Sequence, residues 1–228
     1  MPSARIAALL LVLAAAAAAA APAPARAQER ERLCRDLQNR PMRVGQWATY
    51  RWTGGSTDGT TMRFAIVGTD AQAGATYYWY EMTMDDPKGG AKGKTVIQML
   101  VPGLGYQTGG VRGLVMKNGD EPATRMPDRM VRMMGSRLGS NITAEMTRSC
   151  LEMEVVGWEQ VTVPGGSFRA LHFRHPREGT EAWVRPELYF GLVKVVMKDG
   201  STMVLTGHGA GAQSSIPERP REMIGPRR

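Results

Sequence analysis

The residues that could bind a metal ion are few, and their spacing is unfavourable. The three histidines are His172, His175 and His208. The first two are three residues apart in a predicted strand, so their side chains point to opposite faces of it. His208 lies in the glycine-rich stretch "TGHGAGA". Because a metal site needs ligands that converge on one point, we expect no metal site.

Nucleophilic and acid–base chemistry also lack a pattern in the sequence. There is no G-x-S-x-G motif, and Ser167 follows Gly165–Gly166 in a predicted turn without an acid–histidine pattern beside it. The acid pairs Asp85–Asp86 and Glu152/Glu154 fall in a turn and on a solvated strand face. The sequence therefore predicts no enzyme and no cofactor.

Methionine is the most informative residue type, with 16 copies. Met130, Met133 and Met134 share one face at helical spacing in a segment that begins at Pro127. Thioethers also bind copper(I), but such segments carry closer methionine clusters, often with histidine. We interpret this face as apolar packing that could serve as an adaptable lid over a ligand.

The beginning of the chain predicts export. Arg5, the apolar run 6–21 and the small residues before Gln28 have the pattern of a cleaved signal peptide, residues 1–27. We expect a periplasmic chain with no membrane anchor after cleavage near Ala27. The two cysteines, Cys34 and Cys150, should then form a disulfide in an oxidising compartment.

The rest of the chain has the pattern of an antiparallel sheet, because short β-compatible runs recur about every ten residues. Predicted strands occupy 44–52, 60–68, 75–84, 94–102, 151–163, 167–175 and 180–186, followed by a hairpin over 190–205 with a two-residue turn at Asp199–Gly200. The fold class expected is mainly β with a small α part: a curved antiparallel sheet (half-barrel) with one or two helices on its concave side. One domain should span 28–213, followed by a flexible basic tail over 214–228.

The second half of the chain carries a resemblance to a known group. The runs "VTVPGGSFRALHFRH" and "EAWVRPELYFGLVKVVMKDGSTMVL" contain a V-P-G-G-x-F turn, a W-V strand and an F-G-L-V-K strand. In these features, over about Val44 to Thr206, the chain resembles exported proteins of the superfamily of outer-membrane lipoprotein-sorting carriers. That resemblance implies a half-barrel whose mouth is plugged by helices.

Two functions remain open from the sequence. The first is an extracytoplasmic binding or carrier protein for an apolar or amphipathic, lipid-like molecule. Its candidate ligand residues line the bowl or the lid: Trp47, Tyr78, Tyr80, Met82, Met99, Met130, Met133, Met134 and Trp183. The second is an envelope structural or interaction module whose core is filled by its own side chains. The net charge of +8 favours an anionic envelope surface as partner, and export argues against nucleic acid.

Overall fold

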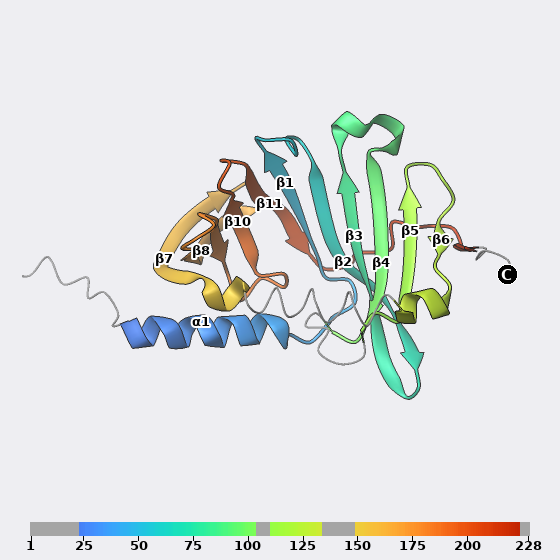
Figure 1. Cartoon of the computed structure of the whole chain (residues 1–228), viewed down its shortest axis with the longest axis horizontal. Helices are drawn as coiled ribbons and strands as arrows, with labels where there is room; N and C mark the ends of the chain where they lie inside the picture. The colour runs from blue at the N-terminus through green and yellow to red at the C-terminus, as the bar shows by residue number, and fades with distance from the viewer. Residues whose placement is uncertain (1–22, 104–109, 134–148, 224–228) are drawn as a thin grey trace, which may run out of the picture.

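The computed structural model describes residues 23–103, 110–133 and 149–223, which form one curved, unclosed sheet (Figure 1). Within these ranges there are 12 strands. Their bounds are β1 Trp47–Thr53, β2 Thr61–Gln72, β3 Ala75–Asp85, β4 Lys94–Val101, β5 Gly113–Asn118, β6 Thr124–Arg125, β7 Glu154–Val163, β8 Gly166–Arg174, β9 Glu181–Val184, β10 Leu192–Val196, β11 Thr202–Gly209 and β12 Arg221–Glu222. The helical segments are α1 Ala23–Gln38, the 3-10 helix η1 Pro87–Lys92, and short α-helical stretches at 128–133 and 149–152.

The strand order joins two meanders in the middle of the sheet. It runs β12-β6-β5-β4-β3-β2-β1-β11-β10-β9-β8-β7, so the first strand pairs with β11, near the end of the chain. These neighbours are antiparallel, with β12 added parallel to β6. The predicted fold class, a curved antiparallel sheet with a small helical part, is confirmed. None of the helices in the described part of the chain has the length and apolar character needed to span a bilayer.

Strand β5 lies in the glycine-rich middle of the chain, where the sequence pattern is typical of a mobile loop or a short ribbon. Gly113 begins β5 and pairs with Leu100 of β4. A Cβ atom at Gly113 would lie 2.9 Å from the Trp79 ring and 3.2 Å from the Leu100 Cβ. Glycine is therefore required here so that the indole can lie over the β4–β5 pair, a role that composition alone does not reveal.

The hairpin between β10 and β11 has a different register from the predicted one. Val196 pairs with Thr202, and the Met197 N–H donates to the Ser201 carbonyl at 2.8 Å. The loop therefore has three residues, and Gly200 takes the left-handed conformation with a φ of 82°. The predicted two-residue turn was wrong, and its correction places Val195 opposite Met203.

The concave face of the sheet carries an aromatic core. We define it as the face that bears Tyr50, Phe64 and Tyr80, and the convex face as the opposite one. The Phe64 and Tyr80 rings stack with centroids 6.1 Å apart. Phe190, from the loop between β9 and β10, reaches across the bowl to within 6.0 Å of Phe64 and 6.3 Å of Tyr80. These contacts fill much of the bowl with the protein's own side chains.

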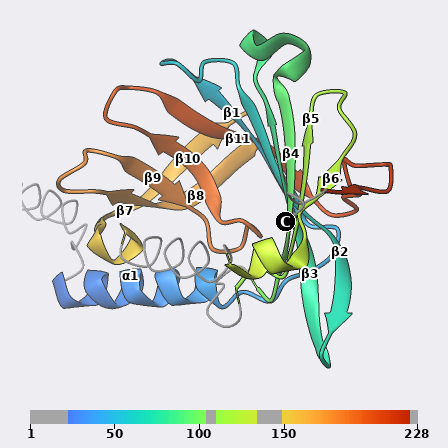
Figure 2. The same ribbon diagram turned by 45° about the vertical axis from the view of Figure 1, so that its right-hand side comes forward.

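An N-terminal helix lies beside the β7–β8 end of the sheet (Figure 2). Leu33 of α1 is 5% exposed and packs with Leu171 and Phe173 of β8. Cys34 forms the predicted disulfide with Cys150, with the Cα atoms 6.0 Å apart. At a sequence separation of 116 residues, this bridge is worth about 4–5 kcal/mol in the chain-entropy model. The helix itself was not predicted, because its charged sequence carries few apolar residues.

The C-terminal segment 213–223 crosses the convex face and is part of the fold, although the sequence predicted a flexible tail from Ser214. It leads behind β3–β5 to β12 (Figure 1).

Glu81 of β3 is 0% exposed. Its carboxylate accepts hydrogen bonds from Arg63 Nη1 (3.0 Å), Gln98 Nε2 (2.8 Å), Ser214 Oγ (3.5 Å), Ser215 Oγ (2.7 Å) and the Ser215 N–H (2.9 Å). Ile216 is buried beside Val96 and Val115. The segment is thus ordered by a buried carboxylate, which sequence composition does not show.

Candidate binding pocket

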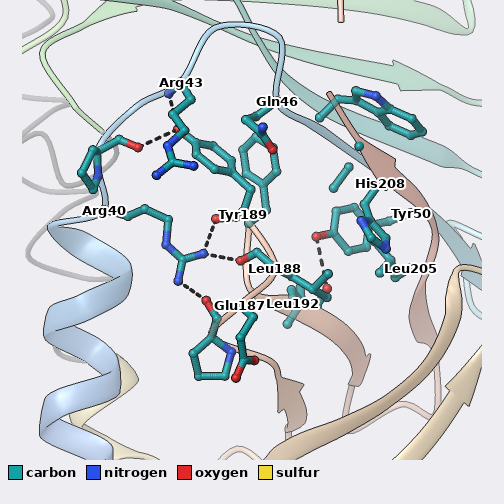
Figure 3. A pocket seen from close by; sticks show the side chains of 16 residues that line it. Arg40, Arg43, Gln46, Tyr50, Glu187, Leu188, Tyr189, Leu192, Leu205 and His208 are labelled. Atoms are coloured by element: carbon teal, nitrogen blue, oxygen red, sulfur yellow. Dashed lines mark hydrogen bonds between the residues drawn. The ribbon is translucent and has the colours of Figure 1, made fainter. Parts of the chain in front are cut away.

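A pocket of about 430 Å³ opens beside the β1–β11 pair in the middle of the sheet. Three parts of the chain form its walls: the linker between α1 and β1, the loop between β9 and β10, and strands β1 and β11 (Figure 3). The lining residues are Arg40, Pro41, Arg43, Gln46, Trp47, Ala48, Tyr50, Pro186, Glu187, Leu188, Tyr189, Phe190, Leu192, Leu205, His208 and Gly209. One wall is therefore rigid sheet, and two walls are connecting segments.

The sheet side of the pocket is mainly apolar and includes the ring of His208. Tyr50 and Leu205 are each 1% exposed, and they face each other across the β1–β11 pair. The Tyr50 hydroxyl donates to the Leu192 carbonyl at 3.3 Å. Burial raises the pKa of Tyr50, so this phenol stays neutral. This side of the pocket suits an apolar group.

The loop side of the pocket is held by Arg40, just after α1. Its guanidinium donates to the backbone carbonyls of Pro186, Leu188 and Tyr189, the last at 2.7 Å (Figure 3). Burial lowers the pKa of Arg40 from its ordinary value. This clamp fixes the β9–β10 loop relative to the linker and so sets the width of the pocket.

Tyr189 fastens the same loop to the linker from the other direction. The Arg43 backbone N–H donates to the Tyr189 hydroxyl oxygen at 2.9 Å, and that hydroxyl donates to the Pro41 carbonyl at 3.3 Å. Burial raises the pKa of Tyr189, partly offset by its hydrogen bond from Arg43. The Arg43 side chain is exposed and lies at the mouth of the pocket.

Of the predicted ligand residues that the structure describes, only Trp47 lines this pocket. Its indole packs over Gly207 and Gly209, on the face opposite to Ala48. Tyr78, Tyr80 and Met99 lie on the concave face beside Met42 and Phe190, in the core next to the pocket. Met82 is half-buried and pairs with Phe64 on the same face.

The predicted methionine lid and Trp183 lie elsewhere. Met130 is half-buried and Met133 is 65% exposed, and neither lines the pocket. Met134 lies outside the described residues. Trp183 stacks on His172 with centroids 4.3 Å apart, away from the pocket. The cause is the same for all three described residues: a helical or strand periodicity identifies an apolar face but not the surface that this face meets.

The sequence reasoning missed Arg40, Arg43 and Tyr189. The arginines stand in a short polar linker, and their proximity to residues near 189 depends on contacts almost 150 residues apart in sequence. One signal was available. Tyr189 lies in the predicted connection 187–189, where polar residues would be usual, and a second aromatic residue, Phe190, follows it.

A second group of titratable side chains surrounds His172, away from the pocket. His172 Nδ1 lies 2.8 Å from a Glu159 oxygen, and Nε2 lies 3.2 Å from a Glu181 oxygen. The Trp183 indole N–H donates to the other Glu159 oxygen at 2.8 Å, and this bond is the main cause that lowers the pKa of Glu159. These groups engage one another, as a structural network does. Within the described ranges, no group of three or more histidine, cysteine or acidic side chains is placed to hold a metal ion.

Comparison with known proteins gives remote structural neighbours. No family model matches the chain, and no curated protein matches it. A predicted lipoprotein from Parabacteroides distasonis is 11% identical, with 74% of this chain and 97% of that one covered and a TM-score of 0.34. A predicted exported protein with a YmcC-like fold from Bacteroides fragilis is 14% identical over the same shares, with a TM-score of 0.34. MucB is 12% identical, with 84% of this chain and 61% of that one covered and a TM-score of 0.35.

The TM-scores of these neighbours lie at or below 0.35, so none of them carries an argument about this chain. The fold assignment therefore rests on the sheet itself, and a function has to be inferred from the pocket.

Proposed function

We propose that this chain is an extracytoplasmic binding or carrier protein for an apolar or amphipathic, lipid-like molecule. The observation that carries the proposal is the pocket of about 430 Å³, mainly apolar on its sheet side and polar at its rim. Pockets for small ligands usually measure about 300–1,000 Å³ and combine apolar walls with a few polar groups. The size of this pocket falls in that range, and its lining combines apolar side chains with a larger share of polar ones, which suits an amphipathic ligand.

Binding fits the lining better than catalysis does. The Tyr50 and Tyr189 hydroxyls donate to backbone carbonyls, and the Glu187 carboxylate pairs with Arg185 at 3.2 Å. A nucleophile with an adjacent base would instead leave one group directed at a substrate. We infer a non-enzymatic role.

Export and a basic surface support the location. A disulfide that ties α1 to the residues before β7 suits the oxidising periplasm. The formal charge of +8 favours contact with anionic envelope surfaces, where an amphipathic ligand would be collected or delivered.

The alternative is an envelope interaction module without a small-molecule ligand. It is favoured by the aromatic packing of Phe64, Tyr80 and Phe190, which fills the bowl with the protein's own side chains. In that case the pocket would hold only water.

Native mass spectrometry of the protein purified from the cell envelope tests the proposal, together with titration of a fluorescent fatty acid. We expect a co-purified amphiphile and saturable uptake by the wild-type chain. Leu188→Trp, which places an indole in the pocket, should abolish uptake. Met197→Trp, at an exposed position of the β10–β11 hairpin, is the matched control and should leave uptake unchanged. An absence of both co-purified molecule and uptake would reject the carrier role.

A further inference from the structure

We propose that the pocket selects amphiphiles with an anionic head group, and that Arg43 is the residue that pairs with this head. The inference rests on the proposed function and adds the charge of the ligand to it. It follows from the different states of the two arginines at the rim, Arg40 and Arg43.

The Arg40 guanidinium is already hydrogen-bonded within the protein. Its guanidinium binds three backbone carbonyls of the β9–β10 loop, at Pro186, Leu188 and Tyr189. A ligand that captured this group would leave those carbonyls without their charged donor, at a cost in free energy. Arg40 is therefore a positioning residue that holds the loop in place.

Arg43 is held by its backbone, and its side chain is available. Its N–H is fixed by the Tyr189 hydroxyl, which keeps the residue at the pocket mouth. Its side chain lies beside Tyr189, at the same end of the pocket as Arg40 (Figure 3). Within the part of the chain that the structure describes, no carboxylate or carbonyl pairs with the Arg43 guanidinium. Glu187, the acidic residue of the lining, is paired with Arg185 at 3.2 Å.

The charged group at the rim and the apolar side chains beside it are arranged like the head and the tail of an amphiphile. An anionic head at Arg43 would place the chain of the ligand along the half-buried Leu188 and Leu192, toward the buried pair of Tyr50 and Leu205. A planar guanidinium suits carboxylate and phosphate heads because it offers two parallel donors. Neutral amphiphiles can use the apolar wall but gain nothing from Arg43.

The experiment compares two probes with the same twelve-carbon chain, dodecanoate and the neutral monododecanoylglycerol. Their dissociation constants are measured by calorimetry on wild type, Arg43→Gln, Arg43→Lys and Arg51→Gln. Arg51 is exposed on β1 and lies on the opposite face from Tyr50, so its substitution removes the same charge without touching the pocket. Circular dichroism and the urea midpoint establish that each variant is folded.

We expect Arg43→Gln to weaken dodecanoate binding about tenfold or more, as the loss of a charge-assisted hydrogen bond should. Arg43→Lys should recover part of the loss, and Arg51→Gln should bind as wild type does. Binding of monododecanoylglycerol should change less than about twofold in Arg43→Gln. Equal wild-type affinity for the two probes, unchanged in Arg43→Gln, would overturn this inference and leave the proposed function standing. Failure of wild type to bind either probe would overturn the proposed function and this inference with it.

Discussion

The first and the last segments that the structure describes both pack against the sheet, but they do so with opposite results. The N-terminal segment, α1 and the linker to β1, is held by a disulfide, by leucine contacts and by Arg40, and it leaves a pocket of about 430 Å³. The C-terminal segment, residues 213–223, is held by a buried carboxylate, and it fills the convex face with Ile216.

The difference lies in how the polar groups are satisfied. Around Glu81 each carboxylate oxygen has partners within the protein, so the site is closed to a ligand. At the pocket, Arg40 is satisfied but the Arg43 side chain is exposed beside an apolar wall. A buried, fully paired polar group stabilises a fold, whereas an accessible one beside apolar surface is suited to recognition.

The largest effect on stability should come from removing the buried Glu81 carboxylate that holds the C-terminal segment. Glu81→Gln removes the buried charge and leaves Arg63 without its ion-pair partner, which should lower the free energy of unfolding by about 3–5 kcal/mol. Urea denaturation measures this loss. Glu121→Gln, at an exposed position after β5, is the matched control and should change stability by less than about 0.5 kcal/mol. A Glu81→Gln variant as stable as wild type would show that the C-terminal segment does not depend on this carboxylate.

A smaller loss of stability should follow from removing the Arg40 guanidinium, which holds the β9–β10 loop at the pocket. Arg40→Gln removes the charged donor from the β9–β10 loop and should cost about 1.5–3 kcal/mol. Because the clamp sets the width of the pocket, uptake of a fluorescent fatty acid should weaken as well. Arg32→Gln, in an exposed ion pair with Asp36, should alter neither property measurably. Unchanged uptake by Arg40→Gln would show that binding does not depend on the hydrogen bonds between Arg40 and the loop.

The smallest expected effect is a loss of stability of the C-terminal segment at acidic pH. Glu218 bonds to Lys117 and to the Ala123 N–H, and its pKa is lowered from 4.5 to about 2, mainly by the Lys117 hydrogen bond. Since the folded-state pKa is depressed, its contribution is present above pH 4.5 and is lost as the pH falls toward 2. Protection factors of the amides in residues 216–223, which are corrected for the pH dependence of intrinsic exchange, should fall over this interval. In Glu218→Gln this fall should be smaller, and a pH profile identical to that of the wild type would show that other groups cause it.

The general architecture could be predicted from sequence because it depends on local patterns. Alternating strands, the turn residues and two cysteines in a chain predicted to be exported indicated the curved sheet and the disulfide between Cys34 and Cys150. Even there, the three-residue turn at 198–200 shifted the β10–β11 register by one residue, because the pattern of Asp199–Gly200 fits two turn types.

The pocket and the C-terminal segment could not be predicted because they depend on long-range polar contacts. Arg40 meets its loop partners almost 150 residues away, and Ser215 meets Glu81 across 134 residues. Neither pairing leaves a periodic signal. The methionine face, in contrast, gave a clear helical signal that did not coincide with the pocket, since Met133 is 65% exposed.

The most direct test of the account is a methyl NMR titration of the protein with dodecanoate. We expect saturable shifts of the Leu188, Leu192 and Leu205 methyl groups, which lie at the pocket, and none at Val96 or Val115 beneath the C-terminal segment. Shifts that are absent, or that concentrate at the valines of the convex face, would contradict the claim that this pocket is the binding site.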